Sequence, residues 1–108
     1  MVDTSSRPPE GTDMAAYVVI ETQVTAPGTY EDYKAIASGV VAAYGGRYLA
    51  RGGAMDVLEG DWTPSRLVIL EFPSLDAARR FYDSPEYAKA REVRAGAATL
   101  RMVAVEGT

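Results

Sequence analysis

Residues 66–87 read RLVILEFPSLDAARRFYDSPEY, and this stretch decides the fold. Its first part, residues 66–72, is the most strongly apolar segment of the chain and predicts a buried β-strand. Pro73 ends the strand, and Ser74 is a good N-cap for a helix that we expect to run to Tyr82. A strand followed directly by a capped helix predicts a protein of mixed α and β structure.

The end of the same stretch predicts that the helical region is broken in two. Ser84, Pro85 and Glu86 repeat the features of a helix start: an N-cap, a proline in the first position and an acid in the first turn. We expect this second helix to run to about Ala95, where Gly96 supplies a stop. The chain therefore has two short helices here in place of one long helix.

Upstream, residues 16–24 (AYVVIETQV) are rich in β-branched and aromatic residues and predict a strand. Residues 25–28 break it, and apolar residues then recur at steps of three and four from Thr29, which predicts an amphipathic helix. Glu31 and Asp32 are expected in its first turn, where they complement the helix dipole. The expected buried stripe consists of Tyr30, Tyr33, Ile36, Ala37, Val40, Val41 and Tyr44.

Two Gly-Gly pairs bracket residues 47–51, which we expect to form a strand. The pair at 45–46 stops the preceding helix, and the pair at 52–53 predicts a bulge or tight turn. Neither pair has the Lys and hydroxyl spacing of a phosphate-binding P-loop, and the first lies between a helix and a strand, the reverse of a dinucleotide fingerprint. Residues 55–58 are expected to form a short further strand, either continuing the previous one or standing alone at an edge.

Alternating residues at 99–105 predict a last strand, which completes the order β-α-β-β-α-β. This is the ferredoxin-like split arrangement, an α+β fold with an antiparallel sheet. Residues 14–108 form its single domain, and residues 1–13 are expected to be a flexible leader. The strands at 16–24 and 66–72 carry apolar side chains on both faces, but the helices cover one face only. We therefore expect a homodimer formed through the bare sheet face.

Composition excludes several classes of function. The 108 residues contain no cysteine and no histidine, which removes thiol catalysis, zinc–thiolate sites and histidine acid–base chemistry. The net charge is −4 without a basic tract, so a nucleic-acid partner is not expected. No acidic ladder suggests a metal site, no cofactor is expected, and no apolar run or signal-peptide pattern suggests a membrane. These features are typical of a cytoplasmic protein.

Two candidate site residues are strand residues with alternative interpretations. Arg51 stands beside a glycine pair at a predicted kink, where it either anchors the carboxylate or oxyanion of a small ligand or pairs across strands with an acid such as Glu71. Glu71 lies opposite the helix-facing side chains of its strand, where an unpaired carboxylate is costly. It acts either as a general base or as the partner of an arginine at the subunit interface.

The other four candidates are aromatic residues and an arginine. Trp62 lies in a turn, and either stacks on a ligand or packs at a dimer contact. Tyr33 and Tyr82 either pack in the core and its rim or donate hydrogen bonds in a pocket between helices and sheet. Arg94 either closes that pocket or caps a helix C-terminus.

Several motifs in order carry a family resemblance: GGRYLARGG, LEGDW, LVILEFPS and FYDSPEY, with Arg94 following. They resemble the bacterial domain of unknown function 1330 family, which belongs to the dimeric α/β-barrel superfamily of ferredoxin-like folds. The resemblance covers residues 15–108. It implies a homodimer, but not a reaction, because the superfamily includes cofactor-free monooxygenases, haem-degrading enzymes, lactone isomerases and binding proteins.

The absence of histidine argues against the superfamily mechanisms that depend on one, including His-ligated haem. Two functions remain. In the first, the dimer binds a small organic ligand between helices and sheet. In the alternative, it is a cofactor-free enzyme of monooxygenase, isomerase or lyase type acting on a small organic substrate.

Overall fold

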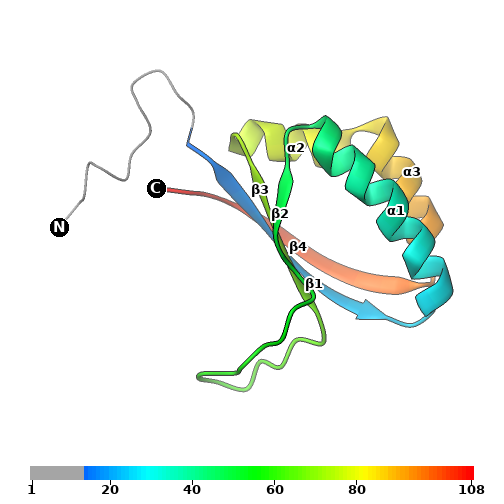
Figure 1. The fold of residues 1–108 in the computed structure, drawn as a ribbon, viewed down its shortest axis with the longest axis vertical. Coiled ribbons are helices and arrows are strands. Elements are labelled where there is room, and N and C mark those ends of the chain that lie inside the picture. The colour runs from blue at the N-terminus through cyan, green and yellow to red at the C-terminus, as the bar shows by residue number, and fades with distance from the viewer. Residues whose placement is uncertain (1–13) are drawn as a thin grey trace.

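The computed structural model describes residues 14–108 as a four-stranded antiparallel sheet with three helices over one face (Figure 1). The predicted leader, residues 1–13, lies outside the described residues. The strands lie in the order β2-β3-β1-β4, so the predicted ferredoxin-like α+β fold is confirmed. The elements are β1 (Ala16–Val24), α1 (Pro27–Ala43), β2 (Arg47–Arg51), β3 (Leu67–Phe72), α2 (Leu75–Asp83), α3 (Pro85–Arg94) and β4 (Ala98–Glu106).

The strand register separates the side chains onto two faces of the sheet. Val18 of β1 pairs with Leu70 of β3 on one side and with Ala104 of β4 on the other. Val18 and Leu70 point toward the helices and are buried, while their sequence neighbours Val19 and Ile69 point to the other face. As predicted, Glu71 lies on that second face, which carries no covering layer in the described chain.

An aromatic cluster anchors the two short helices to the sheet. The rings of Phe72 and Phe81 have centroids 5.1 Å apart, and those of Phe81 and Tyr87 are 4.5 Å apart. All three side chains are almost completely buried. Gly46 lies against the first ring, because a Cβ at this position would sit 2.6 Å from Cε1 of Phe72. Gly46 therefore leaves space for the Phe72 ring in addition to helping to end α1.

The predicted helix caps are present. Ser74 Oγ accepts a hydrogen bond from the backbone N–H of Ala77 at 3.0 Å. Ser84 Oγ accepts one from Tyr87 N–H at 3.1 Å and donates to the carbonyl of Phe81 at 2.8 Å. Ser84 thus ends α2 and starts α3 with the same hydroxyl, which explains why the helical region is broken at this residue.

Two predictions about α1 are wrong. The helix begins at Pro27, so Glu31 and Asp32 lie in its second turn and leave the first turn without an acid. Ile36 was expected in the buried stripe, but it is 39% exposed. The buried positions Tyr33, Ala37, Val40 and Val41 define a narrower stripe, and Ile36 lies on its margin.

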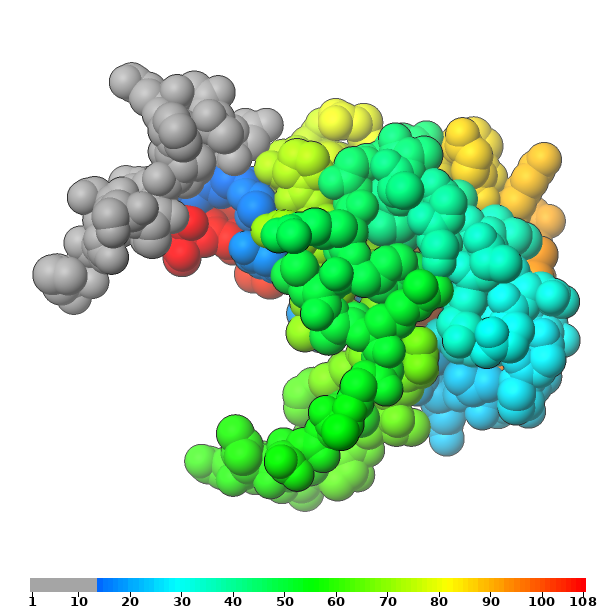
Figure 2. All heavy atoms as spheres, viewed as in Figure 1, coloured from blue at the N-terminus to red at the C-terminus, as the bar shows by residue number. Residues whose placement is uncertain are grey.

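The predicted strand at residues 55–58 is also absent. These residues belong to the connection between β2 and β3, which projects from the sheet on the side away from the helices (Figure 1). Figure 2 shows this connection as an arm separated from the body by a hollow. Residues with strand propensity form no strand here because no neighbouring strand of the described chain lies alongside to pair with them.

Within residues 14–108, no helix is both long enough and apolar enough to cross a membrane.

Candidate functional site

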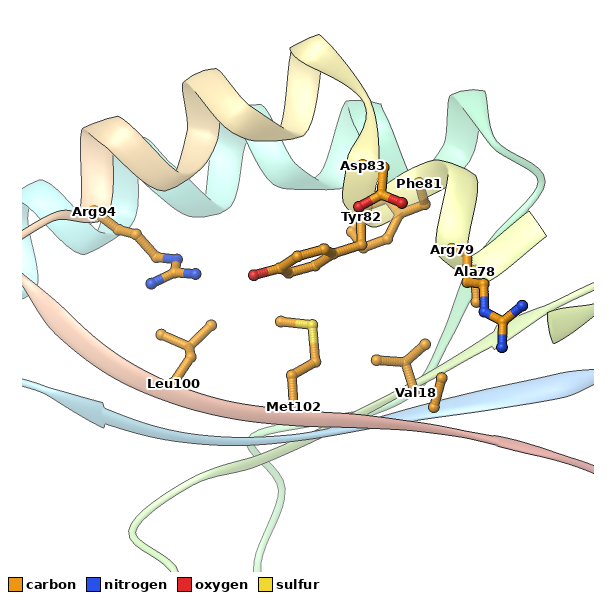
Figure 3. Close-up of a pocket in the computed structure, with 10 residues that line it drawn as sticks. Val18, Ala78, Arg79, Phe81, Tyr82, Asp83, Arg94, Leu100 and Met102 are labelled. Atoms are coloured by element: carbon orange, nitrogen blue, oxygen red, sulfur yellow. The ribbon is translucent and has the colours of Figure 1, made fainter. Parts of the chain in front are cut away.

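A partly open cleft of about 440 Å³ lies between the helices α2 and α3 and the β1–β4 side of the sheet (Figure 3). Its floor is apolar and comes from alternate residues of the two strands, which point toward the helices. Val18 of β1 and Leu100, Met102 and Ala104 of β4 form this floor. Phe81 and Ala78 close the cleft on the α2 side.

Polar groups gather at the rim of the cleft. Figure 3 shows the side chains of Arg94 and Tyr82 pointing toward each other above Leu100 and Met102. Asp83 and Arg79 line the rim nearer to α2. A cation and a phenol hydroxyl therefore face each other over an apolar floor, an arrangement that suits a ligand with one anionic end and an apolar body.

Arg94 carries donors that the described chain does not satisfy. Its Nε is buried and has no hydrogen-bond partner within residues 14–108. No ion pair to Arg94 is formed by the described residues either, although the four pairs that are formed use Lys34, Arg47, Arg80 and Arg101. The described residues form no hydrogen bond with the terminal nitrogens of Arg94 either, and Figure 3 shows its guanidinium in the cleft, so these N–H groups are available to an acceptor that enters the cleft.

On the core side of the cleft, the ring of Tyr33 makes a cation–π contact with Arg94. The Arg94 guanidinium lies 5.5 Å from the centroid of that ring, within the range of a cation–π contact. The Tyr33 hydroxyl is in turn hydrogen-bonded to the Tyr87 hydroxyl at 2.7 Å. Burial, reinforced by Tyr87, raises the pKa of Tyr33 well above its usual value, so the Tyr33 hydroxyl is neutral at physiological pH.

The structure brings together two of the six predicted site residues. Tyr82 and Arg94 line the cleft, and Arg94 also lies in the last turn of α3, so both roles considered for it stay predictions. Tyr82 is 41% exposed because it stands at the cleft rim. Tyr33 lies behind Arg94 in the core and does not line the cleft.

Arg51 and Glu71 lie elsewhere, and they do not pair with each other. Glu71 accepts a hydrogen bond from Nε of Arg47, its direct cross-strand neighbour, at 2.5 Å. Arg51 lies on the helix-facing side, where its Nη2 donates to Ser38 Oγ at 2.8 Å. The pairing considered for Arg51 is therefore wrong. The reason is a bulge between Tyr48 and Ala50 that shifts the register and moves Arg51 to the opposite face from Arg47.

Trp62 also lies away from the cleft. It stands in the arm between β2 and β3 and is 56% exposed. It lines a shallow recess with Val19, Leu67 and Val103 on the bare face of the sheet.

Residues that were not predicted as site residues complete the cleft. Leu100 and Met102 were recognised as alternating strand residues but not as a cleft floor. Asp83 is the last residue of α2, and Arg79 lies one turn before it. The predicted helix break at Ser84 could have indicated a cleft near these two residues, because a break between two helices leaves space beside the sheet. No group of three or more acidic side chains within residues 14–108 is placed to hold a metal ion.

Comparison with known proteins gives a family and a fold. Residues 15–108 match the family described as "Domain of unknown function (DUF1330)". No curated protein matches the sequence. A protein of unknown function from Rhodopseudomonas palustris has a similar structure, with a TM-score of 0.71, 20% sequence identity, and coverage of 89% of this chain and 84% of that one.

Two further solved structures share the fold. A dimeric ferredoxin-like protein of unknown function from Thermobifida fusca matches with a TM-score of 0.62 and 18% identity, covering 88% of this chain and 92% of that one. SnoaB, a cofactor-independent oxygenase from Streptomyces nogalater, matches with a TM-score of 0.61 and 14% identity, covering 88% and 94%. At these identities the likeness establishes the fold alone.

Proposed function

The chain belongs to this family of unknown function, and we propose that its cleft binds a small organic acid whose carboxylate or enolate pairs with Arg94. One observation carries the proposal: an arginine with unpaired donors points into a cleft with an apolar floor. The cleft volume of about 440 Å³ lies within the range of small-molecule sites, roughly 300–1,000 Å³.

Each part of the ligand has a place in the cleft. The planar guanidinium of Arg94 offers two parallel N–H donors, which match the two oxygens of a carboxylate. Leu100 and Met102 support an aromatic or aliphatic body, and the Tyr82 hydroxyl reaches a second polar atom. Arg79 adds positive charge at the far end of the rim.

We also propose that the protein is a homodimer joined through the bare face of the sheet. A cross-strand row of Ala50, Ile69, Val19 and Val103 runs across the middle of this face. Ion pairs stand on either side of the row, between Arg47 and Glu71 and between Arg101 and Glu21. An apolar centre with a charged rim is the usual composition of a protein interface. The Thermobifida fusca protein, which has the same fold, is described as dimeric.

The alternative function is a cofactor-free enzyme that uses the same cleft. Two observations favour it: the fold is that of SnoaB, and Asp83 places a carboxylate at the rim. In this case the Asp83 carboxylate takes a proton from the carbon next to a carbonyl group of the ligand, the electron pair of that C–H bond forms an enolate, and Arg94 stabilises the enolate oxygen. The alternatives differ in one outcome: an acid that binds and is converted by the wild type, but binds to Asp83→Asn without conversion, favours the enzyme, whereas an acid that the wild type binds without conversion favours the binding protein.

The experiment is a thermal-unfolding screen with small aromatic and aliphatic carboxylic acids, each tested beside its neutral amide. A ligand at 100 times its Kd stabilises the native state by about 2.7 kcal/mol, which is a readily measured rise in Tm. We expect acids to raise the Tm and amides to have no effect. Arg94→Gln removes the response, whereas Arg80→Gln, which alters an exposed arginine paired with Asp76, preserves it. Equal responses of acids and amides would contradict the proposal.

A further inference from the structure

A second recess, separate from the cleft, lies at the opposite edge of the sheet. The cleft is at the β4 edge, whereas this recess lies beside β2, between α1 and the start of β3. It has a volume of about 460 Å³ and shares no lining residue with the cleft. Its lining residues are Glu31, Lys34, Ala35, Ser38, Arg51 and Arg66, and we call it the basic basin.

The basic basin concentrates positive charge on an acidic protein. Lys34, Arg51 and Arg66 line it together with one carboxylate, Glu31, which pairs with Lys34 at 2.8 Å. Three cations and one anion leave a local net charge of +2, although the whole chain carries −4. A concave surface with this charge attracts anions from solution.

Aromatic rings hold the two guanidinium groups in place. Arg51 lies 4.2 Å from the centroid of the Tyr48 ring and donates to Ser38 Oγ at 2.8 Å. Arg66 lies 5.8 Å from the centroid of the Tyr30 ring. A cation–π contact uses the face of a guanidinium group, so the N–H donors that the chain does not already use remain available to a ligand.

The side chain of Arg66 has an unpaired hydrogen-bond donor and packs against the backbone of Gly52. Its Nε is buried without a hydrogen-bond partner among the described residues. Gly52 lies directly against the guanidinium, because a Cβ at this residue would collide with Nη1 of Arg66. Gly52 also has a φ of +70°, a conformation that other residues rarely adopt. The second Gly-Gly pair thus begins with a residue whose backbone conformation favours glycine, and the absence of a side chain there leaves space for the Arg66 guanidinium.

The bulge in β2 creates the basic basin. Arg47 and Arg51 are four residues apart and would share a face of a regular strand. The register shift between Tyr48 and Ala50 sends Arg51 to the α1 side, next to Arg66, while Arg47 remains on the bare face with Glu71. Bulges often change the direction of a side chain, and here the bulge directs Arg51 toward α1.

We propose that the basic basin binds the dianionic phosphate group of a small phosphomonoester. A phosphomonoester carries close to two negative charges at neutral pH, which matches the net charge of +2. Its three terminal oxygens accept from two guanidinium forks and the Lys34 ammonium at once. A monocarboxylate would leave one fork unused. This proposal is independent of the organic-acid cleft.

The test is an NMR titration of the ¹⁵N-labelled full-length chain at pH 7.5 and constant ionic strength. The probes are inorganic phosphate, glucose 6-phosphate and AMP, with glucose, adenosine and acetate as matched controls. We expect saturable shifts of the Ser38 and Gly52 amides with all three phosphates, and none at Leu100 and Met102 in the cleft. If glucose 6-phosphate binds more tightly than AMP, the ligand is a sugar phosphate. If AMP binds more tightly, the ligand is a nucleotide.

Variants establish which side chains hold the phosphate. Arg66→Gln and Arg51→Gln are each expected to weaken binding at least about tenfold, a loss of one charge-assisted hydrogen-bonding group. Lys34→Gln changes a partly buried residue on the surface of α1; we expect this variant to fold normally and to show a smaller loss. Arg80→Gln is the control that binds like the wild type. The proposal is overturned if acetate produces the same shifts as phosphate, if no phosphate produces shifts at Ser38, or if binding survives all three basin variants.

Discussion

The guanidinium of Arg94 lies over the ring of Tyr33, 5.5 Å from its centroid, and so joins the rim of the cleft to the core of the fold. Tyr33 is fixed by its hydroxyl contact with Tyr87, whose ring packs on Phe81. Arg94 is therefore backed by a rigid aromatic cluster. This matters because a site that is already formed loses less entropy when the ligand binds.

The first prediction concerns the buried hydroxyl pair. Tyr33→Phe or Tyr87→Phe alone leaves the other hydroxyl buried without its partner, which costs about 1–3 kcal/mol of the free energy of unfolding. The double variant removes both hydroxyls, and its cost is expected to be well below the sum of the single costs. Urea denaturation of the four proteins measures this coupling. Additive costs would show that the hydroxyls act independently.

Stability is also expected to fall in alkaline solution because of Tyr33. Burial raises its pKa in the folded chain, whereas the unfolded chain ionises near pH 10. Below pH 10 the residue is neutral in both states and contributes no pH dependence. Above it the unfolded chain releases the proton first, so the free energy of unfolding falls by up to about 1.4 kcal/mol per pH unit. Denaturation midpoints from pH 8 to 11 should fall less steeply for Tyr33→Phe. Parallel curves for the two proteins would refute this assignment.

Two glycines near the end of α1 provide a matched pair of substitutions. Gly46→Ala places a Cβ 2.6 Å from Cε1 of Phe72 and 2.9 Å from Cγ1 of Val41, so we expect a loss of about 1–3 kcal/mol. Gly39→Ala lies within α1 with nothing in its way and should gain up to about 1 kcal/mol. Thermal unfolding of the two variants should therefore shift Tm in opposite directions. A neutral Gly46→Ala would show that the aromatic cluster tolerates the added methyl group.

The dimer proposal predicts the effect of a charge on the bare face. Val103 is 62% exposed in the single chain and lies in the central apolar row, next to Val19. Val103→Asp should give a monomer with an intact fold, since a buried unpaired carboxylate is costly in an interface. Lys89→Asp on the exposed side of α3 is the control and should remain dimeric. Light scattering after gel filtration measures both masses, and a wild-type monomer would rule out this interface.

Local signals in the sequence predicted most of the fold. Ser74 and Ser84 act as caps through contacts with residues three positions away, so a short stretch of sequence contains all the information needed. The faces of β3 followed from simple alternation. Residues 55–58 were misassigned because strand propensity does not supply a partner strand, and the arm lies beyond the sheet.

The candidate site was predictable only in part, since it depends on contacts between distant residues. Tyr82 and Arg94 were predicted as site residues, and they line the same cleft because α2 and α3 lie over the same part of the sheet. The position of Arg51 was not predictable, because one extra residue in β2 reverses its face and strand periodicity gives no warning of it. For the same reason Lys34 and Arg66, its neighbours in the basic basin, were not recognised.

The most direct test of the central proposal is native mass spectrometry of the wild-type protein and Arg94→Gln, both as purified from cells and after mixing with the organic-acid panel. We predict that the wild type carries the mass of a small organic acid in at least one of these preparations and that Arg94→Gln carries none. A wild-type protein that stays free of any such mass in both preparations would contradict the proposed cleft function. An acid retained equally by Arg94→Gln would contradict the role assigned to this arginine.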